Sequence, residues 1–406
     1  MTPARDAGGQ TRLSGTTLVP LVALAILLGY VVFSASRITH GFVAYYAASR
    51  LVVAGQLGPT IYDDDWFQRF VQELTGTEVL EIFGPNPPTM ALMAVPVAWL
   101  DHTAARSVWL LASLTSFVVA IALLGRAADQ RAIPPLLLAA LLLNPTVFAN
   151  LRIGQAYLFV SALLAATCLS LVRGHVSLAG FFLGLALALK SSGVAFLVML
   201  AAQRRWRTLG VALLVASAAA ALVLLIAEPR TWVAYPDYVR AFVARASSSV
   251  TAYQTTLAFV RHLCVADAVW NPSPAANCAF LARTVPPLIL GSALGLTLLS
   301  SRNASMRHWL AAAVCLSELT LPVAAEPHFV SLIIPVLLLW PFNELGRWRL
   351  AFLGLVAVLL FVPLDWTTHK FTSGWSALAA YPRLYAAWLL WGAAVFAMIA
   401  PTEQGT

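Results

Sequence analysis

Three consecutive carboxylates stand between aromatic residues in the segment IYDDDWF, residues 61–67. A carboxylate in a watery pocket is a suitable base for removing a proton from a hydroxyl group. The competing interpretation is structural, because aspartates at the start of a helix accept hydrogen bonds from free backbone amides and complement the helix dipole. Three adjacent acids on a helix do not all face one ion, so no metal site is predicted. Asp63, Asp64 and Asp65 are therefore candidate bases, and the capping role stays open.

Cationic and amide side chains interrupt two apolar stretches. Lys190 lies within LALALKSSGVAF, residues 186–197, where a charge is costly unless it pairs or faces a polar cavity. Such a cation suits a phosphate group. Arg152 and Gln155 lie in NLRIGQAYLF, between two apolar runs, and are further candidate ligands.

A carboxylate and a histidine share a helix junction in LPVAAEPHFVSLIIP, residues 321–335. A lone histidine at an interface is usually only solvated. Because Glu326 and a proline break adjoin it, His328 is a candidate acid, base or phosphate ligand.

Two of the four cysteines, Cys264 and Cys278, share one polar segment. They are candidates for a disulfide if that segment faces an oxidising compartment. The other two lie in apolar runs and are interpreted as packing residues.

The composition indicates the elements that must position these side chains. The 406 residues are 60% hydrophobic and only 10% charged, which a soluble core does not accommodate. We expect an all-α polytopic membrane protein in which residues 17–400 form one domain. The apolar runs fall at 17–36, 86–100, 106–125, 133–149, 156–172, 177–200, 209–227, 285–300, 309–325, 329–342, 350–364 and 383–400.

The basic turns at 203–207, 300–308 and 343–349 predict about twelve spans with both termini in the cytoplasm. The short run 86–100 or 133–149 is a candidate re-entrant segment instead. Two longer segments, 37–85 and 228–284, then face outside. The tails 1–16 and 401–406 are expected to be disordered.

The charge and motif content excludes several functions. The net charge of +8 is spread over short loops, so a nucleic-acid partner is not expected. The sequence has no nucleophile elbow, Walker loop, dinucleotide fingerprint or HExxH motif, which removes the simplest support for hydrolases, nucleotide-driven pumps and zinc proteases.

Six motifs in order resemble glycosyltransferase family 87, a family of membrane mannosyltransferases of the GT-C class that depend on polyprenol phosphate. The resemblance runs from about residue 37 to about residue 341. The motifs are the first-loop aromatics Phe42, Tyr45, Tyr46, Tyr62 and Phe67 with Asp63, then NPP at Asn86–Pro88, GQ at Gly154–Gln155, Ala179–Lys190, Gln254 with Thr255, and PHFVSLIIP at 327–335.

The resemblance implies a GT-C-like bundle in a bacterial inner membrane with an outward-facing active site. A hexose, by family default mannose, would pass with inversion from a polyprenyl-phosphate donor to an envelope glycolipid or glycan. No cofactor is implied. The residues and the resemblance together give the candidate substrate-binding set Lys190, His328, Glu326, Gln155, Arg152, Gln254, Tyr45 and Tyr46.

The sequence departs from the family at one position. Family members usually carry an aspartate directly before Phe42, where this chain has Gly41 preceded by His40. Three explanations are open: one of Asp63, Asp64 and Asp65 serves as the base, or His40 does, or catalysis is lost.

Two other functions remain as alternatives. In a transporter or lipid flippase, Lys190 and Arg152 would be charges along the substrate path, although the chain shows no internal repeat. In a non-catalytic protein that stabilises another envelope enzyme, the missing aspartate would need no replacement.

Overall fold

The computed structural model describes residues 15–130, 133–190, 193–245 and 250–400. These residues form helices joined by short connections, and no strand occurs among them. Most of the predicted tails, 1–14 and 401–406, lie outside the described residues, while α1 already begins at Gly15.

Six helical segments of the described chain are long and apolar enough to cross a membrane, and a seventh results if a bent pair of segments counts as one span. The protein is therefore a polytopic helical membrane protein, as predicted, but about twelve spans are not confirmed. The bent pair, Glu326–Leu339 with Asn343–Phe361, turns by 116°. The six are α1 (Gly15–Ala35), α4 (His102–Ala127), α5 with α6 (Pro135–Ile153), α10 (Trp206–Ile226), α13 (Ala279–Ser300) and α18 (Pro382–Ile399).

Local sequence breaks the predicted apolar runs. Prolines divide 86–100 into the short 3-10 helices η2 (Pro88–Leu92) and η3 (Val95–Val97). Asn144 separates α5 (Pro135–Leu142) from α6 (Pro145–Ile153), and its side chain caps α6 by accepting from the backbone N–H of Thr146. Both proposed re-entrant segments are thus interrupted.

The run 177–200 divides into α8 (Val176–Lys190) and α9 (Val194–Ala202), and Gly193 before α9 has a φ of 90°. Lys190 is the last described residue of α8, residues 191–192 lie outside the described residues, and α9 begins after Gly193, so the predicted run is not one continuous helix. A cation suits the last turn of α8 because the C-terminal end of a helix carries partial negative charge.

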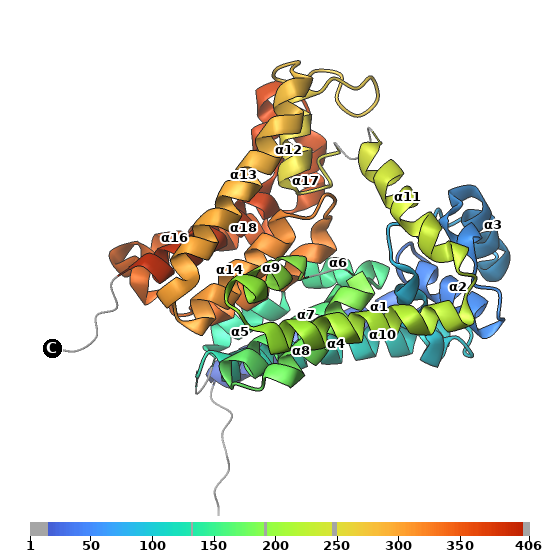
Figure 1. Cartoon of the computed structure of the whole chain (residues 1–406), viewed down its shortest axis with the longest axis horizontal. Helices are drawn as coiled ribbons and strands as arrows, with labels where there is room; N and C mark the ends of the chain where they lie inside the picture. Colours follow the sequence, from blue (N-terminus) through green and yellow to red (C-terminus); the bar gives the residue numbers. More distant parts are fainter. Residues whose placement is uncertain (1–14, 131–132, 191–192, 246–249, 401–406) are drawn as a thin grey trace, which may run out of the picture.

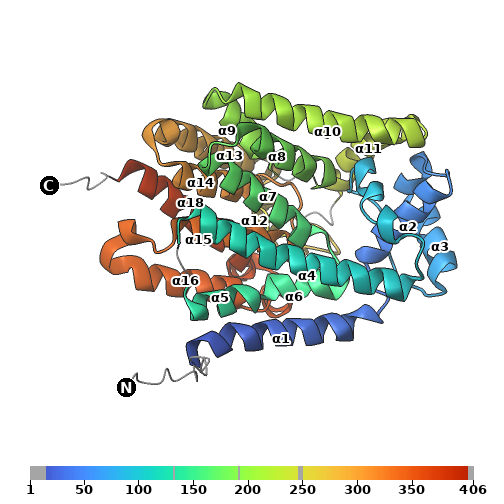
Figure 2. The same ribbon diagram turned by 90° about the horizontal axis from the view of Figure 1, so that it is seen from below.

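Figure 2 shows α4, α7 (Tyr157–Val172) and α8 lying between α1 and α10. Helix α8 meets α10 through Gly180 and Gly184, one helical turn apart. A Cβ at Gly184 would lie 2.6 Å from the carbonyl oxygen of Ala212, so only glycine allows the two backbones to approach this closely.

Of the second predicted outside segment, α11 (Arg230–Ala244) meets the first at one end of the bundle, while α12 (Thr256–Cys264) lies apart from it (Figure 1). The first segment contains α2 (Phe42–Val53) and α3 (Asp64–Thr75). The two segments pack through aromatic rings: Tyr62 contacts Tyr238, and Gly84 lies so close to Tyr238 that a Cβ there would be 1.9 Å from its ring.

The C-terminal part of the chain completes the bundle. Its remaining elements are α14 (Met306–Leu319), η6 (Glu326–Leu332), α15 (Ile333–Leu339), η7 (Asn343–Trp348), α16 (Arg349–Phe361), α17 (Leu364–Lys370) and η8 (Gly374–Ala380).

The contact between α8 and α10 gives a test by glycine substitution. We expect Gly184→Ala to lower the midpoint of thermal unfolding in detergent, because overpacking costs about 1–3 kcal/mol. Gly295→Ala in α13 is the matched control, since a Cβ there meets nothing within 4 Å and alanine favours a helix. An equal response of the two variants would show that the close approach does not support the fold.

Candidate active site

A cavity of about 340 Å³ opens where the two outside segments meet the membrane helices. One wall comes from α2 and the stretch 81–87, and the opposite wall comes from α11 and residues 321–323. The ends of membrane helices supply Lys190 and His328. The structure thus joins the first outside segment to the 326–328 corner around one hollow.

Lys190 is held by three acceptors. Its ammonium donates to the hydroxyl of Tyr45 at 2.8 Å, to Oδ1 of Asn86 at 2.5 Å and to Oε1 of Gln155 at 3.5 Å. It also lies 4.9 Å from the ring centroids of Tyr45 and Tyr157. Because an ammonium has three N–H groups, these contacts offset its desolvation and leave the long one to Gln155 as the weakest.

Glu81 brings a carboxylate into the same cavity. Its Oε2 accepts a hydrogen bond from the backbone N–H of Gly41, and its Oε1 accepts one from the N–H of Ile82 at 3.0 Å. Burial raises the pKa of Glu81 to about 7, against the opposing effects of these two hydrogen bonds and the charge of Lys190. Among the described residues that line the cavity, Glu81 is the only carboxylate.

His328 lies against the ring of Tyr157, near which the Lys190 ammonium also lies. Its Nε2 is 2.5 Å from the Tyr157 hydroxyl, its Nδ1 is 3.1 Å from the carbonyl oxygen of Ala325, and the two rings pack with centroids 4.0 Å apart. Both ring nitrogens therefore have protein partners, which fixes the orientation of the imidazole.

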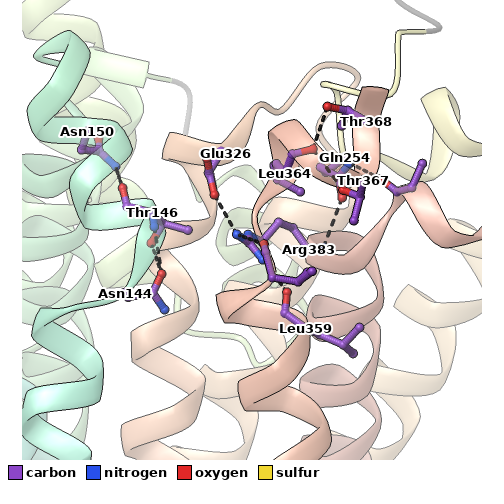
Figure 3. Close-up of polar contacts among 12 residues, drawn as sticks. Asn144, Thr146, Asn150, Gln254, Glu326, Leu359, Leu364, Thr367, Thr368 and Arg383 are labelled. Carbon is purple, nitrogen blue, oxygen red and sulfur yellow. Dashed lines mark hydrogen bonds and ion pairs between the residues drawn. The ribbon is translucent and has the colours of Figure 1, made fainter. Parts of the chain in front are cut away.

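The turn that carries His328 is held from two sides, and Figure 3 shows the side of Glu326 and Arg383. On one side, the guanidinium of Arg383 in α18 donates to Glu326 at 2.7 Å and to the carbonyl oxygens of Val362 and Leu359. On the other side, Asn150 of α6 donates to the carbonyl oxygen of Pro327 at 2.9 Å. Arg383 is fully buried, so this ion pair forms part of the fold.

Gln254 ties the second outside segment to the same support (Figure 3). Its side-chain NH₂ group donates to the backbone carbonyl oxygens of Thr251 and Ala380, at 2.7 and 2.8 Å. Its side-chain oxygen Oε1 accepts a hydrogen bond from the backbone N–H of Arg383. The predicted substrate ligands Gln254 and Glu326 therefore lie behind the cavity wall and support it.

The three aspartates lie away from the cavity. Asp63 caps α3 by accepting from the N–H of Trp66, so the capping interpretation describes its geometry. Asp64 accepts from the Tyr238 hydroxyl at 2.8 Å and pairs with Arg245 at 3.1 Å. Asp65 is exposed, and none of the three lines the cavity.

Three further predicted residues also lie outside the cavity. His40 and Arg152 are exposed, and Tyr46 is buried with its hydroxyl donating to the carbonyl oxygen of Leu100 at 2.7 Å. Four predicted residues line it together: Lys190, His328, Gln155 and Tyr45.

The sequence alone did not single out Glu81, and it indicated Asn86 only as part of the NPP motif. A signal for Glu81 was present, because this single acid stands among apolar residues in VLEIFGP, which indicates a buried carboxylate. For Asn86, the motif NPP marks a helix start, and only the fold shows that its side chain turns towards Lys190.

The predicted disulfide is not formed in the structure. Cys264 and Cys278 are free thiols, although the N–H of Cys278 donates to the carbonyl oxygen of Cys264 at 2.9 Å. Cys264 is buried against Val260 and Ala282, and Cys278 precedes α13 in a more open place. No cluster of three or more histidine, cysteine or acidic residues occurs within the described ranges, and the metal-free interpretation stays a prediction.

The fold and the cavity define an integral membrane protein with a polar site for a charged ligand. The chain belongs to glycosyltransferase family 87, which matches residues 85–325, more than half of its length. It is therefore a membrane glycosyltransferase. Comparison with curated proteins and with solved structures finds no match. Glu81 and His328 both lie outside the matched range.

The contribution of the Arg383–Glu326 ion pair behind His328 can be tested by measuring thermal unfolding. Arg383→Met leaves the partly buried Glu326 without its partner, and breaking a buried ion pair costs about 3–5 kcal/mol. Arg240→Met is the control, because its pair with Asp237 is exposed and worth about 0–1 kcal/mol. Thermal unfolding in detergent should separate the two variants, and an Arg383 variant as stable as the control would contradict this role.

Glu81 should make stability depend on pH. Its folded pKa is raised from 4.5 to about 7, so the folded state favours the protonated form and loses stability as pH rises through 7. At about 1.4 kcal/mol per pKa unit, the loss is on the order of 3 kcal/mol. Glu81→Gln should therefore unfold at a higher temperature than the wild type at pH 8, with little difference at pH 4.5. A difference that does not change with pH would contradict the buried carboxylate.

Proposed function

We propose that this glycosyltransferase moves a hexose from a polyprenyl-phosphate donor to an acceptor on the outer side of the membrane. The observation that carries the proposal is the cavity itself, in which a buried ammonium and a carboxylate share one hollow. A phosphate leaving group needs a cation, and an acceptor hydroxyl needs a base.

Lys190 suits the phosphate of the donor. An incoming phosphate oxygen would replace the long contact to Gln155, while the shorter contacts to Tyr45 and Asn86 keep the ammonium in place. His328 lines the same hollow and shares the Tyr157 ring with Lys190, so it would contact the phosphate or the sugar.

An apolar groove adjoins the cavity and suits the carrier chain. It encloses about 650 Å³ and is lined almost entirely by apolar side chains of α4, α7, α8 and α10. Thr89 and Ala188 line it and are joined by a hydrogen bond from the Thr89 hydroxyl to the Ala188 carbonyl oxygen. Asn86 lies three residues before Thr89 and Lys190 lies two residues after Ala188, so the groove begins close to the polar wall of the cavity.

The reaction then follows from the contents of the cavity. The acceptor oxygen attacks the anomeric carbon and forms the new glycosidic bond, while the bond from that carbon to the phosphate oxygen breaks. The electron pair leaves with the phosphate beside Lys190. The acceptor proton passes to a base on the opposite face of the sugar, so the configuration inverts.

The proposal also covers the donor sugar, the acceptor and the membrane. Mannose is the first donor sugar to test, and an envelope glycolipid or glycan is the acceptor class. The enzyme is placed in a bacterial inner membrane with the cavity facing outward, and neither a nucleotide nor a metal is required by this chemistry.

Transfer of radiolabelled mannose from polyprenyl-phosphate mannose in membranes tests the function. Lys190→Met keeps the length of the side chain and removes its charge, and we expect transfer to fall about 100-fold or more, as when one electrostatic partner of the leaving group is lost. Lys370→Met, in α17, is the control, because Lys370 is an exposed lysine that does not line the cavity.

Two outcomes would count against the proposal. Full activity of Lys190→Met would remove the phosphate assignment. A wild-type protein that transfers no sugar from any polyprenyl-phosphate donor would instead favour the transporter or the non-catalytic partner.

A further inference from the structure

We propose that Glu81 is the catalytic base of this enzyme and that the backbone N–H of Gly41 holds its carboxylate in place. This inference rests on the proposed glycosyl transfer and identifies the group that takes the acceptor proton. It is carried by the position of Glu81 in the cavity and by the backbone geometry at Gly41.

The other candidate bases are unsuited by geometry. His328 has both ring nitrogens occupied, by the Tyr157 hydroxyl and the Ala325 carbonyl oxygen. His40 and the aspartates at 63–65 do not line the cavity. Glu81 is thus the one acidic side chain in the wall as far as the described residues define it.

The hydrogen bonds leave Glu81 able to accept a proton. Each carboxylate oxygen takes one backbone N–H, from Gly41 on Oε2 and from Ile82 on Oε1. A carboxylate oxygen accepts two hydrogen bonds, so each oxygen keeps a free position for a hydroxyl group. No ion pair involves Glu81 in the part of the chain that the structure describes, so no salt bridge must break first.

The backbone at Gly41 excludes a carboxylate on residue 41 itself. Its φ is 99°, a conformation that side chains other than hydrogen rarely allow. A Cβ there would lie 2.4 Å from the carbonyl oxygen of Ile153, which is fixed backbone. Gly41 therefore contributes an N–H group only, and the carboxylate comes from forty residues later in the same outside segment.

The proposed step accounts for the acceptor proton and for the electrons of the broken bond. The acceptor hydroxyl gives its proton to a Glu81 oxygen as its own oxygen bonds to the anomeric carbon, and the departing phosphate keeps the electron pair of the broken bond. Glu81 becomes neutral, and the phosphate, a diester with one negative charge in the donor, leaves as a monoester with a second negative charge beside Lys190. A base works best when its pKa lies near the working pH, and the burial of Glu81 raises its pKa to about 7.

The test uses the full-length protein in membranes with polyprenyl-phosphate mannose. We expect Glu81→Gln to lower kcat by about 100-fold or more, as for loss of a general base, and to leave the KM for the donor nearly unchanged. Glu78→Gln is the matched control, because Glu78 is an exposed carboxylate three residues earlier that does not line the cavity. It should keep wild-type activity.

The pH profile separates a base from a structural residue. Wild-type kcat should rise with pH through a midpoint near 7, and the residual activity of Glu81→Gln should lose this rise. Glu81→Asp retains the carboxylate at a shorter reach, so it should retain the pH rise at reduced kcat. Thermal unfolding of each variant shows that the bundle is intact.

The outcomes distinguish a wrong assignment of Glu81 from a wrong proposed function. Wild-type activity of Glu81→Gln, or an unchanged pH rise in its residual activity, would overturn the assignment of Glu81 while leaving the transfer reaction in place. If Glu81→Gln did not fold, a Glu81→Asp variant without the pH rise would overturn it equally. A wild-type enzyme inactive with every polyprenyl-phosphate sugar would overturn the proposed function, and this inference with it.

Discussion

The buried ammonium of Lys190 is the interaction on which the arrangement of the cavity depends. A charge at the end of α8 is tolerated only because three distant segments bring an oxygen to it: Tyr45 from α2, Asn86 from the stretch before η2, and Gln155 from the start of α7. Desolvation of one group thus sets the relative positions of the first outside segment and the membrane helices. The cavity walls follow from that constraint.

The residues that share the cavity were partly predictable from sequence. Lys190 and His328 stand out as polar groups in apolar surroundings, and the order of the motifs placed Gln155 and Tyr45 beside them. Glu81 was not singled out, because its place depends on the path of a long loop that folds back onto Gly41. Three adjacent aspartates gave the stronger pattern in sequence, yet they serve the end of α3 and its contact with α11.

The number of membrane-spanning helices was less predictable from sequence than the cavity residues. Mean hydropathy measures how apolar a run is, but not whether its backbone continues as one helix. Prolines in 86–100 and the cap at Asn144 divide runs that are uniformly apolar, and Gly193, with its positive φ, precedes α9, while the described part of α8 ends at Lys190. Lys190 and the residues just before η2 line the cavity, so two of these interruptions lie next to the site.

The contact between Arg383 and Glu326 has a consequence for biogenesis. Arg383 is translated after every other residue of the cavity and its support, from Gly41 to His328. Until α18 has been made and has packed against the bundle, the corner that carries His328 is held only from the side of α6, by Asn150.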